Sequence, residues 1–154
     1  MSYDGETFTG TTMGSNGLVG AIARPSVPCL TIAYHPDSKR VGDQLRMPGL
    51  LLGQRVELGR LEPHWTTQIG GTGGPLNDPF LSRRPVGFSW KEGALIVDPT
   101  STNTRVCVDG HVITQANHLS DADLTRGAVI ELGDRVVLVA HWSYGQPDPS
   151  TNLG

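Results

Sequence analysis

The sequence predicts an all-β fold, a β-sandwich or a small barrel built from short strands. Of 154 residues, 20 are glycine and 11 are proline, which favours many turns and excludes a helical bundle or coiled coil. Several short segments alternate apolar and polar residues, which is the period of a half-buried strand. A helical pattern is confined to one short segment near the end of the chain.

Seven segments carry the strand pattern and give the order of the predicted elements. They are residues 30–35, 55–58, 86–90, 95–97, 106–108, 128–132 and 136–140. The last two are nearly continuous apolar runs, typical of central strands buried on both faces. Glu92-Gly93, Asp109-Gly110 and Gly133-Asp134 lie between neighbouring segments, and such pairs favour tight hairpin turns. The predicted fold is therefore rich in antiparallel hairpins.

The two remaining features between the strands are a short helix and a long loop. Ser120 begins a helix that ends at Arg126, because Ser120 and Asp123 suit a capping box and Gly127 ends the pattern. Residues 61–81 show no periodicity and include the glycine-rich run Gly70–Pro75. A loop of this length inside a compact domain is usually functional or disordered.

Composition divides the chain into three parts. Residues 1–28 are rich in glycine, serine and threonine without periodicity, and they predict a flexible leader. Residues 29–142 hold all the strand patterns and suit a single domain. Residues 143–154 predict a flexible linker or the cut end of a longer chain. The sequence shows neither a signal peptide nor a membrane-spanning run, so we expect a cytoplasmic protein.

Charge and cysteine usage exclude several classes of function. The net charge is −3 with only two lysines, which excludes binding to nucleic acid mainly by bulk charge but permits a local arginine cluster. Cys29 and Cys107 are too far apart for a structural zinc site and are weak evidence for a disulfide. The five histidines lack metal-ligand spacing, and the glycine run lacks the lysine of a phosphate loop. We expect neither a metal nor a cofactor.

Three inter-strand segments carry the polar side chains that point to a binding function. Gly59-Arg60 ends a strand, Ser82–Arg84 begins the next, and Thr100–Thr104 lies between two further strands. Loops of a sandwich cluster at its ends, so these segments are expected to converge. Guanidinium groups, hydroxyls and a carboxamide suit a phosphate monoester. The absence of an obvious general base favours holding a phosphate over cleaving it.

Four motifs in this order resemble the forkhead-associated (FHA) domain. They are residues 58–60, 78–84, 98–103 and 108–110, followed by a closing hairpin-like stretch over residues 124–138. The resemblance spans about Leu30 to Trp142 and implies a sandwich of about eleven strands, in two mainly antiparallel sheets. It also implies a non-enzymatic module that binds phosphothreonine peptides. The string Leu76–Pro85 is similar to N-terminal FHA domains of bacterial sigma-54-dependent transcription activators, which implies a regulatory domain of such a protein.

The resemblance implies roles for five residues. Arg60 would contact the phosphate, Ser82 would donate a hydrogen bond to a phosphate oxygen, and Arg83 would contact phosphate or peptide. Thr102 and Asn103 match the segment whose asparagine holds the peptide backbone. The implied partner is a phosphothreonine-containing protein or peptide, in trans or in the same polypeptide. Neither nucleic acid nor membrane is an expected partner of this domain.

Two departures from the family pattern keep a second hypothesis open. Pro85 stands where the family usually has histidine, and Thr104-Arg105 follows Asn103 in place of glycine and threonine. A degenerate FHA domain acting as a phospho-independent regulatory or dimerisation platform is therefore the alternative. A hydrolytic site around Asp78, Asp98 and a histidine is disfavoured, because no metal spacing and no nucleophile elbow accompany it.

Overall fold

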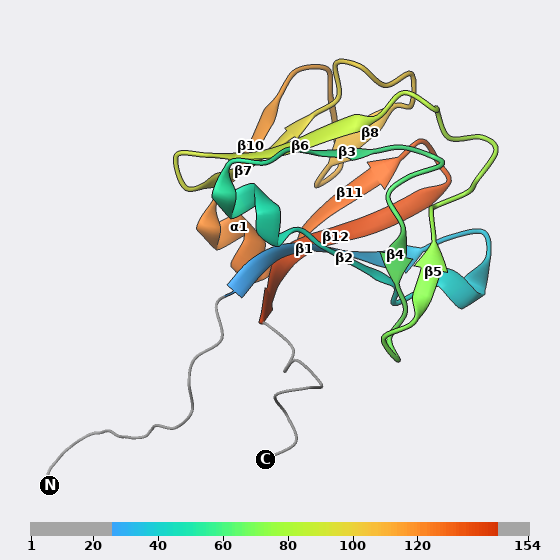
Figure 1. The fold of residues 1–154 in the computed structure, drawn as a ribbon. Helices are drawn as coiled ribbons and strands as arrows, with labels where there is room; N and C mark the ends of the chain where they lie inside the picture. Colours follow the sequence, from blue (N-terminus) through green and yellow to red (C-terminus); the bar gives the residue numbers. More distant parts are fainter. Residues whose placement is uncertain (1–25, 145–154) are drawn as a thin grey trace, which may run out of the picture. The chain divides into compact units, whose positions relative to one another are not determined.

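The computed structural model describes residues 26–144, so the predicted leader up to residue 25 and the predicted linker from residue 145 lie outside the described residues. The described part forms twelve strands in two sheets (Figure 1), against the sandwich of about eleven strands that the family resemblance implies. This arrangement confirms the predicted all-β sandwich. No helix in the described part is long and apolar enough to cross a membrane.

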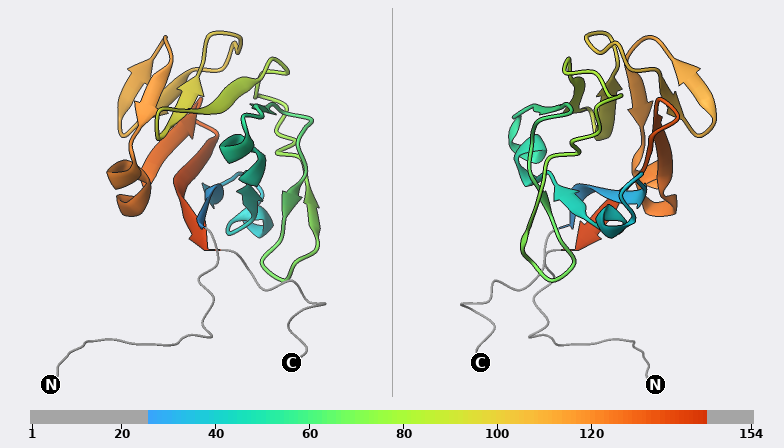
Figure 2. Two further views of the ribbon diagram at one scale, coloured as in Figure 1. Left: turned by 60° about the vertical axis from the view of Figure 1, so that its left-hand side comes forward. Right: turned by 90° about the vertical axis from the view of Figure 1, so that its right-hand side faces the viewer.

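The larger sheet has eight strands and the smaller has four (Figure 2). In spatial order the larger sheet contains β5 (Thr72–Gly74), β4 (Trp65–Thr66), β2 (Gln44–Arg46), β1 (Ser26–Tyr34), β12 (Val136–Tyr144), β11 (Ala128–Leu132), β8 (Val106–Val108) and β9 (His111–Ile113). The smaller contains β10 (Asn117–Leu119), β7 (Ala94–Asp98), β6 (Val86–Lys91) and β3 (Val56–Leu58). Helix α1 (Asp121–Arg126) and two 3₁₀ helices, Ser38–Arg40 and Pro48–Leu52, lie between strands.

One hydrophobic core joins the inner faces of the two sheets. Leu30 and Ile32 of β1 and Leu138 of β12 contribute from the larger sheet, and Phe88 of β6 and Val97 of β7 contribute from the smaller. All five side chains are fully buried. They follow the alternation of each strand, because every second residue of a strand points to the same face. The periodicity that predicts the strands therefore also identifies the core.

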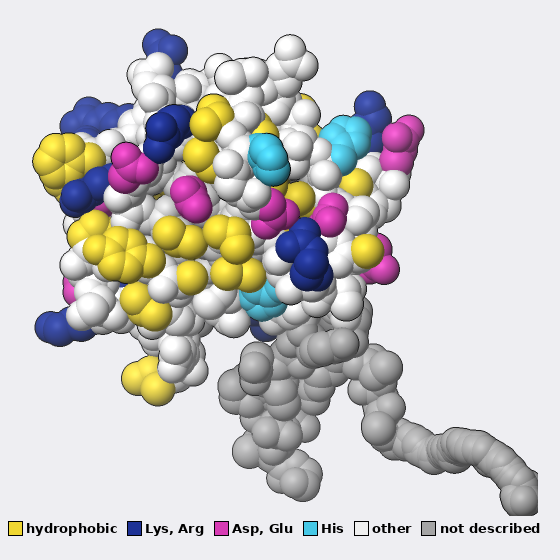
Figure 3. Space-filling view, turned by 180° about the vertical axis from the view of Figure 1, so that it is seen from behind, with side chains coloured by type: hydrophobic (Ala, Val, Ile, Leu, Met, Phe, Trp, Pro, Cys, Tyr) yellow, Lys and Arg dark blue, Asp and Glu magenta, His cyan; other side chains and the backbone are white. Residues whose placement is uncertain are grey.

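The central strands β11 and β12 are buried on one face only, so the prediction of burial on both faces is wrong. Residues of β11 alternate between buried and half-buried, and in β12 Val137 and Val139 are half-buried between buried neighbours. The physical reason is that each sheet of a two-layer sandwich packs one face against the core. Hydrophobic side chains form a band across the surface seen from behind (Figure 3).

The prediction of an unpatterned loop over residues 61–81 is also wrong in part. Strands β4 and β5 form a hairpin that extends the larger sheet, with Gln44 of β2 paired to Thr66. Trp65 is buried there, and Gly70 adopts a positive φ of 90° in the turn. Strand β4 has only two residues, which is too few to show alternation, and the glycine run hides β5. The three-residue strands β2, β9 and β10 also escape prediction, whereas β3 and β8, of the same length, carry a detectable pattern.

The first and last strands extend a few residues beyond the predicted domain edges. Strand β1 begins at Ser26, inside the predicted leader, because Val27 as well as Cys29 is buried. Strand β12 continues to Tyr144, beyond the predicted edge at residue 142. Pro28 lies within β1, where its carbonyl accepts a hydrogen bond from the Met47 backbone N–H (2.8 Å).

Local signals for the helix and the hairpins are confirmed. The Ser120 hydroxyl accepts a hydrogen bond from the Asp123 backbone N–H, and the Asp123 carboxylate accepts one from the Ser120 N–H, which completes the capping box. Asp109 and Gly110 have φ angles of 48° and 84°, the left-handed pair that a two-residue hairpin turn requires. The capping box and the hairpin turn could be predicted from the sequence, because they depend on neighbouring residues alone.

Both cysteines are free and buried in the described part of the chain. Burial raises the pKa of the Cys29 thiol from 9.0 to about 11, which keeps the thiolate population very low near neutral pH. At pH 8 iodoacetamide is therefore expected to leave Cys29 unmodified in the folded protein and to alkylate it after unfolding in urea. Peptide mass spectrometry measures both states, and equal rates of alkylation in the two states would contradict the prediction.

Candidate functional site

Strand pairing brings the predicted polar segments to one end of the sandwich. Leu58 at the end of β3 pairs with Val86 at the start of β6, and the end of β7 at Asp98 lies beside the same end of β6. In the larger sheet Leu132 at the end of β11 pairs with Val106 at the start of β8. The connections after β3, before β6 and between β7 and β8 therefore leave the sheets together, as the sandwich topology predicts.

Ser82 joins two of these connections through a set of short hydrogen bonds. Its backbone N–H donates to the Thr104 hydroxyl at 2.8 Å, and the Thr104 N–H donates to the Thr102 hydroxyl at 3.1 Å. The Ser82 hydroxyl oxygen accepts from the N–H groups of Arg84 (3.0 Å) and Asn103 (3.3 Å). Because that hydroxyl acts only as an acceptor in these bonds, its proton remains available to a further acceptor.

Arg60 lies on the connection that leaves β3, and its backbone and side chain are both anchored. Its Nη1 donates to the Pro79 carbonyl at 3.0 Å, and its own carbonyl accepts from the Asn77 N–H at 2.8 Å. No carboxylate pairs with the Arg60 guanidinium among the described residues. A single backbone contact leaves other N–H groups of the guanidinium fork available for an anion.

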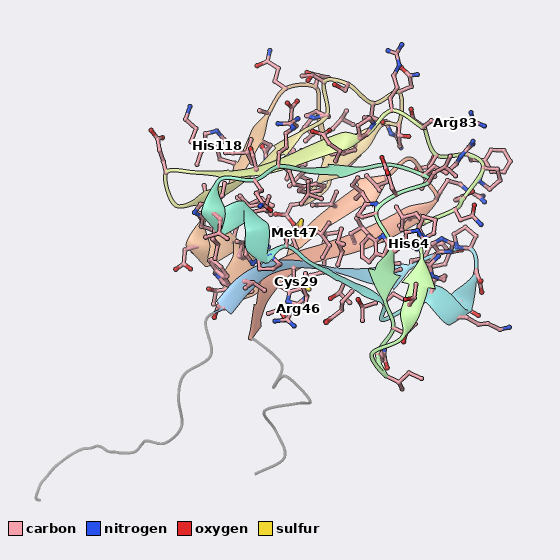
Figure 4. The ribbon with its side chains drawn as sticks, in the orientation of Figure 1. Cys29, Arg46, Met47, His64, Arg83 and His118 are labelled. Atoms are coloured by element: carbon pink, nitrogen blue, oxygen red, sulfur yellow. The ribbon has the colours of Figure 1, made fainter. Side chains whose placement is uncertain are left out.

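Gly59 allows the connection after β3 to approach the Ser82 segment. A Cβ atom at Gly59 would lie 3.1 Å from the Arg83 carbonyl oxygen, tighter than ordinary van der Waals contact. The side chains of Arg83 and Arg84 are exposed and have no partner among the described residues. Figure 4 shows Arg83 at the outside of one end of the sandwich. Three arginine-bearing loop positions, at residues 60, 83 and 84, therefore gather at this end.

An ion pair between the buried Asp78 and the partly exposed Arg135 fixes the turn that anchors Arg60. The Asp78 carboxylate is 1% exposed and accepts from Nε (2.8 Å) and Nη2 (3.2 Å) of Arg135, and from the Phe80 N–H at 3.1 Å. Burial acts to raise the pKa of Asp78, but the hydrogen bonds from Arg135 and Phe80 outweigh it and hold the pKa below its ordinary value. The carbonyl of Pro79, between Asp78 and Phe80 in this turn, accepts the hydrogen bond from the Arg60 side chain.

His35 is a second anchor of the segment that precedes β6. It is 6% exposed, its Nδ1 accepts from the Asp37 N–H at 2.9 Å, and its Nε2 lies 2.8 Å from the Leu76 carbonyl. These two bonds fix the tautomer with the proton on Nε2. The bond from His35 to Leu76 could not be predicted, because the two residues are 41 positions apart in the sequence.

Asp98, at the same end of the sandwich, is committed to structural hydrogen bonds. The Asp98 carboxylate accepts from the Thr100 hydroxyl (2.7 Å) and N–H (3.0 Å) and lies 3.4 Å from Arg55 Nη2. The hydrogen bonds from Thr100 contribute most, and together with the contact to Arg55 they lower the pKa of Asp98. An ionised carboxylate held in this way is a poor proton donor. Within residues 26–144, no group of three or more His, Cys, Asp or Glu could hold a metal ion, and Figure 4 shows His64 and His118 well apart.

Two hollows of different size flank the Ser82 segment. The one between Ser82, Thr102 and the core encloses about 10 Å³, which is about the least that holds one water. The other is an open groove of about 330 Å³ on the side of Arg83. Its lining residues are Glu57, Gly59, Leu61, Glu62, Arg83 and Pro85. The candidate site is thus an exposed loop surface with an open groove beside it.

Comparison with known proteins shows likeness at the level of the fold. The chain is similar to the solution structure of the FHA domain of an Arabidopsis thaliana hypothetical protein, with a TM-score of 0.57 and 19% identity over 88% of this chain and 99% of that one. It is similar to the FHA domain of the CT664 protein from Chlamydia trachomatis, with a TM-score of 0.52 and 16% identity over 78% and 100% of the two chains. Neither a protein-family model nor a curated protein matches the sequence.

Proposed function

We propose that this domain is a phosphothreonine-peptide-binding interaction module. The observation that carries the proposal is the Ser82 hydroxyl, which two backbone N–H groups hold in place while its proton stays free. Its segment contacts the loop of Arg60, whose guanidinium is not paired with a carboxylate in the described residues. The likeness in fold to FHA domains supports the same conclusion.

The chemistry of the ligand fits the groups gathered at this end. A phosphothreonine carries about −1.5 to −2 charges at pH 7 and three strong acceptor oxygens. Arg60 and Arg83 supply guanidinium forks, Ser82 supplies a hydroxyl donor, and Thr102 and Asn103 lie on the loop bonded to Ser82. The paired carboxylates Asp78 and Asp98 lack the freedom that proton transfer requires, so binding rather than turnover is the proposed activity.

The wider role proposed for the domain rests on one sequence string. Residues 76–85 are similar to the N-terminal FHA domains of bacterial sigma-54-dependent transcription activators, and we include in the proposal a regulatory role in such a cytoplasmic protein. In that setting the phosphothreonine would lie in another protein or in the same polypeptide.

A phospho-independent platform is the second candidate function. The outer face of the larger sheet favours it, because Val129, Val137 and Val139 are half-buried there and Figure 3 shows a hydrophobic band on the surface seen from behind. Such a band suits contact with another protein surface. Pro85, which replaces the usual histidine of the family pattern, also favours it.

An oriented peptide screen tests the proposal. Wild type is expected to select peptides with phosphothreonine over the same peptides with phosphoserine or unmodified threonine, at micromolar Kd. Ser82→Ala should weaken binding roughly five- to tenfold, because one hydrogen bond to a charged group contributes about 1.5 kcal/mol or less when exposed. Ser101→Ala is the matched control, since Ser101 is exposed on the Thr102 loop and makes no hydrogen bond among the described residues.

Two outcomes would contradict the proposal. One is the absence of any phosphothreonine peptide that binds at micromolar concentration. The other is equal affinity of wild type and Ser82→Ala for the selected peptide. Either result would favour the platform, which predicts association that does not depend on phosphate.

A further inference from the structure

The groove beside Arg83 is continuous with the proposed phosphate site. Arg83 and Gly59 line it, and the close approach of Gly59 to the Arg83 carbonyl joins its two walls. Its volume of about 330 Å³ lies at the lower end of the roughly 300–1,000 Å³ found for ligand pockets. Strand β3, which supplies Glu57, is the edge strand of the smaller sheet, so no further strand of the described part covers this side.

The charge of the groove is opposite to that of the phosphate site. Glu57 and Glu62 contribute two carboxylates, against one guanidinium from Arg83. The Glu57 carboxylate is already paired with Arg55, which also reaches Asp98. The Glu62 carboxylate is exposed and has no hydrogen-bond or ion-pair partner among the described residues. Glu62 is therefore the carboxylate of the groove that is free to pair with a cation.

The walls next to these carboxylates are apolar. Leu61 is 52% exposed, although leucine normally avoids water, and Pro85, which also lines the groove, is half-buried. An aliphatic chain that ends in a cation would contact the apolar residues with its methylene groups and a carboxylate with its charged end. Lysine and arginine side chains have this construction, because they bury their methylene stems on apolar surface while the charged head stays hydrated or paired.

We propose that this groove binds a lysine or arginine side chain of the phosphothreonine peptide, so that the domain selects phosphopeptides with a basic residue near the phosphate. The inference rests on the proposed function and adds the class of partner to it. The stem packs against Leu61 and Pro85, and the charged head pairs with Glu62. The carboxylates also repel acidic residues at the same peptide position, so the groove favours basic residues and disfavours acidic ones.

The expected size of the effect is modest, because the pair is open to solvent. Exposed ion pairs contribute about 0.2–1 kcal/mol, so lysine should bind up to about fivefold tighter than alanine at the selected position. Glutamate there should bind more weakly than alanine. Screening by salt should reduce the whole range, since exposed charges interact less at high ionic strength.

The test uses fluorescein-labelled peptides with a central phosphothreonine in an alanine background. Each flanking position in turn carries lysine, alanine or glutamate, and fluorescence anisotropy gives Kd at low and high salt. In wild type one position should rank lysine over alanine over glutamate. Glu62→Gln should remove most of this ranking, and Glu62→Lys should reverse it, while binding of the alanine peptide stays within about threefold.

Glu92→Gln is the matched control. It removes the same charge from an exposed glutamate in the turn between β6 and β7, which is the end of β6 away from Val86. The control should keep the wild-type ranking. Two results would overturn the inference and leave the proposed function standing. One is an unchanged ranking in Glu62→Lys. The other is a wild-type protein that binds the alanine phosphopeptide but shows no preference among lysine, alanine and glutamate. Failure of every phosphopeptide to bind would overturn both.

Discussion

Replacing Arg60 by alanine is expected to weaken binding of a phosphothreonine peptide by a factor of about one hundred or more. Hydrogen bonds to charged groups contribute about 1.5–3 kcal/mol each, and a guanidinium fork makes two of them to one phosphate. Two bonds at the lower figure give about 3 kcal/mol, which corresponds to a little over a hundredfold in Kd. Isothermal titration calorimetry with the selected peptide measures this change.

Two further variants separate charge from geometry at this position. Arg60→Lys keeps the positive charge but loses the planar fork, so we expect an intermediate Kd. Lys91→Ala removes one charge from the far end of β6 and should leave Kd within twofold of wild type. A thermal melt of Arg60→Ala detects any loosening caused by loss of the bond to the Pro79 carbonyl. A folded Arg60→Ala protein with wild-type affinity would contradict the assigned role.

Much of the fold could be predicted because its signals are local. Alternation over β6 identifies that strand and residues that face the core, whereas the apolar runs of β11 and β12 identify those two strands but not which of their faces is buried. The Ser120 cap and the Asp109-Gly110 turn depend on neighbouring residues, and both have the predicted geometry. The convergence of the polar segments also follows from sequence, because the order of strands in a sandwich determines which connections share an end.

The parts that could not be predicted depend on contacts between distant residues. Asp78 meets Arg135, which is 57 positions later, and no periodicity or motif links the two. Ser82 meets Thr104 across 22 positions, through a bond that only the folded loops create. The hairpin of β4 and β5 joins the larger sheet through the pairing of Gln44 with Thr66, two residues that are distant in the sequence. Sequence reasoning therefore finds the candidate binding groups but misses the residues that hold them in place.

The Asp78–Arg135 pair bears on the proposed function, because it holds the turn that anchors Arg60. Asp78→Asn is expected to lower the free energy of unfolding by about 2 kcal/mol at pH 7, because three hydrogen bonds to a buried carboxylate lose their charge. Urea unfolding followed by tryptophan fluorescence measures the loss. Asp134→Asn is the control, since its side chain is 87% exposed and pairs with an exposed arginine, and it should change stability by less than about 0.5 kcal/mol.

The pH dependence of the same variant gives a second and independent test. The folded state holds the pKa of Asp78 below its ordinary value of 3.8, so the folded state binds this proton less readily than the unfolded chain. The stabilisation is therefore fully present above about pH 4 to 5 and is lost as the pH falls through the lowered folded-state pKa. The difference in stability between wild type and Asp78→Asn should be constant from pH 5 to pH 7 and should shrink below pH 4.

Because Asp98, Asp109 and Asp123 also have lowered pKa values and occur in both proteins, their contributions cancel in this difference. A difference that grows on acidification would mean that Asp78 is held protonated in the fold, and the ion pair would then not be the anchor of the Arg60 turn.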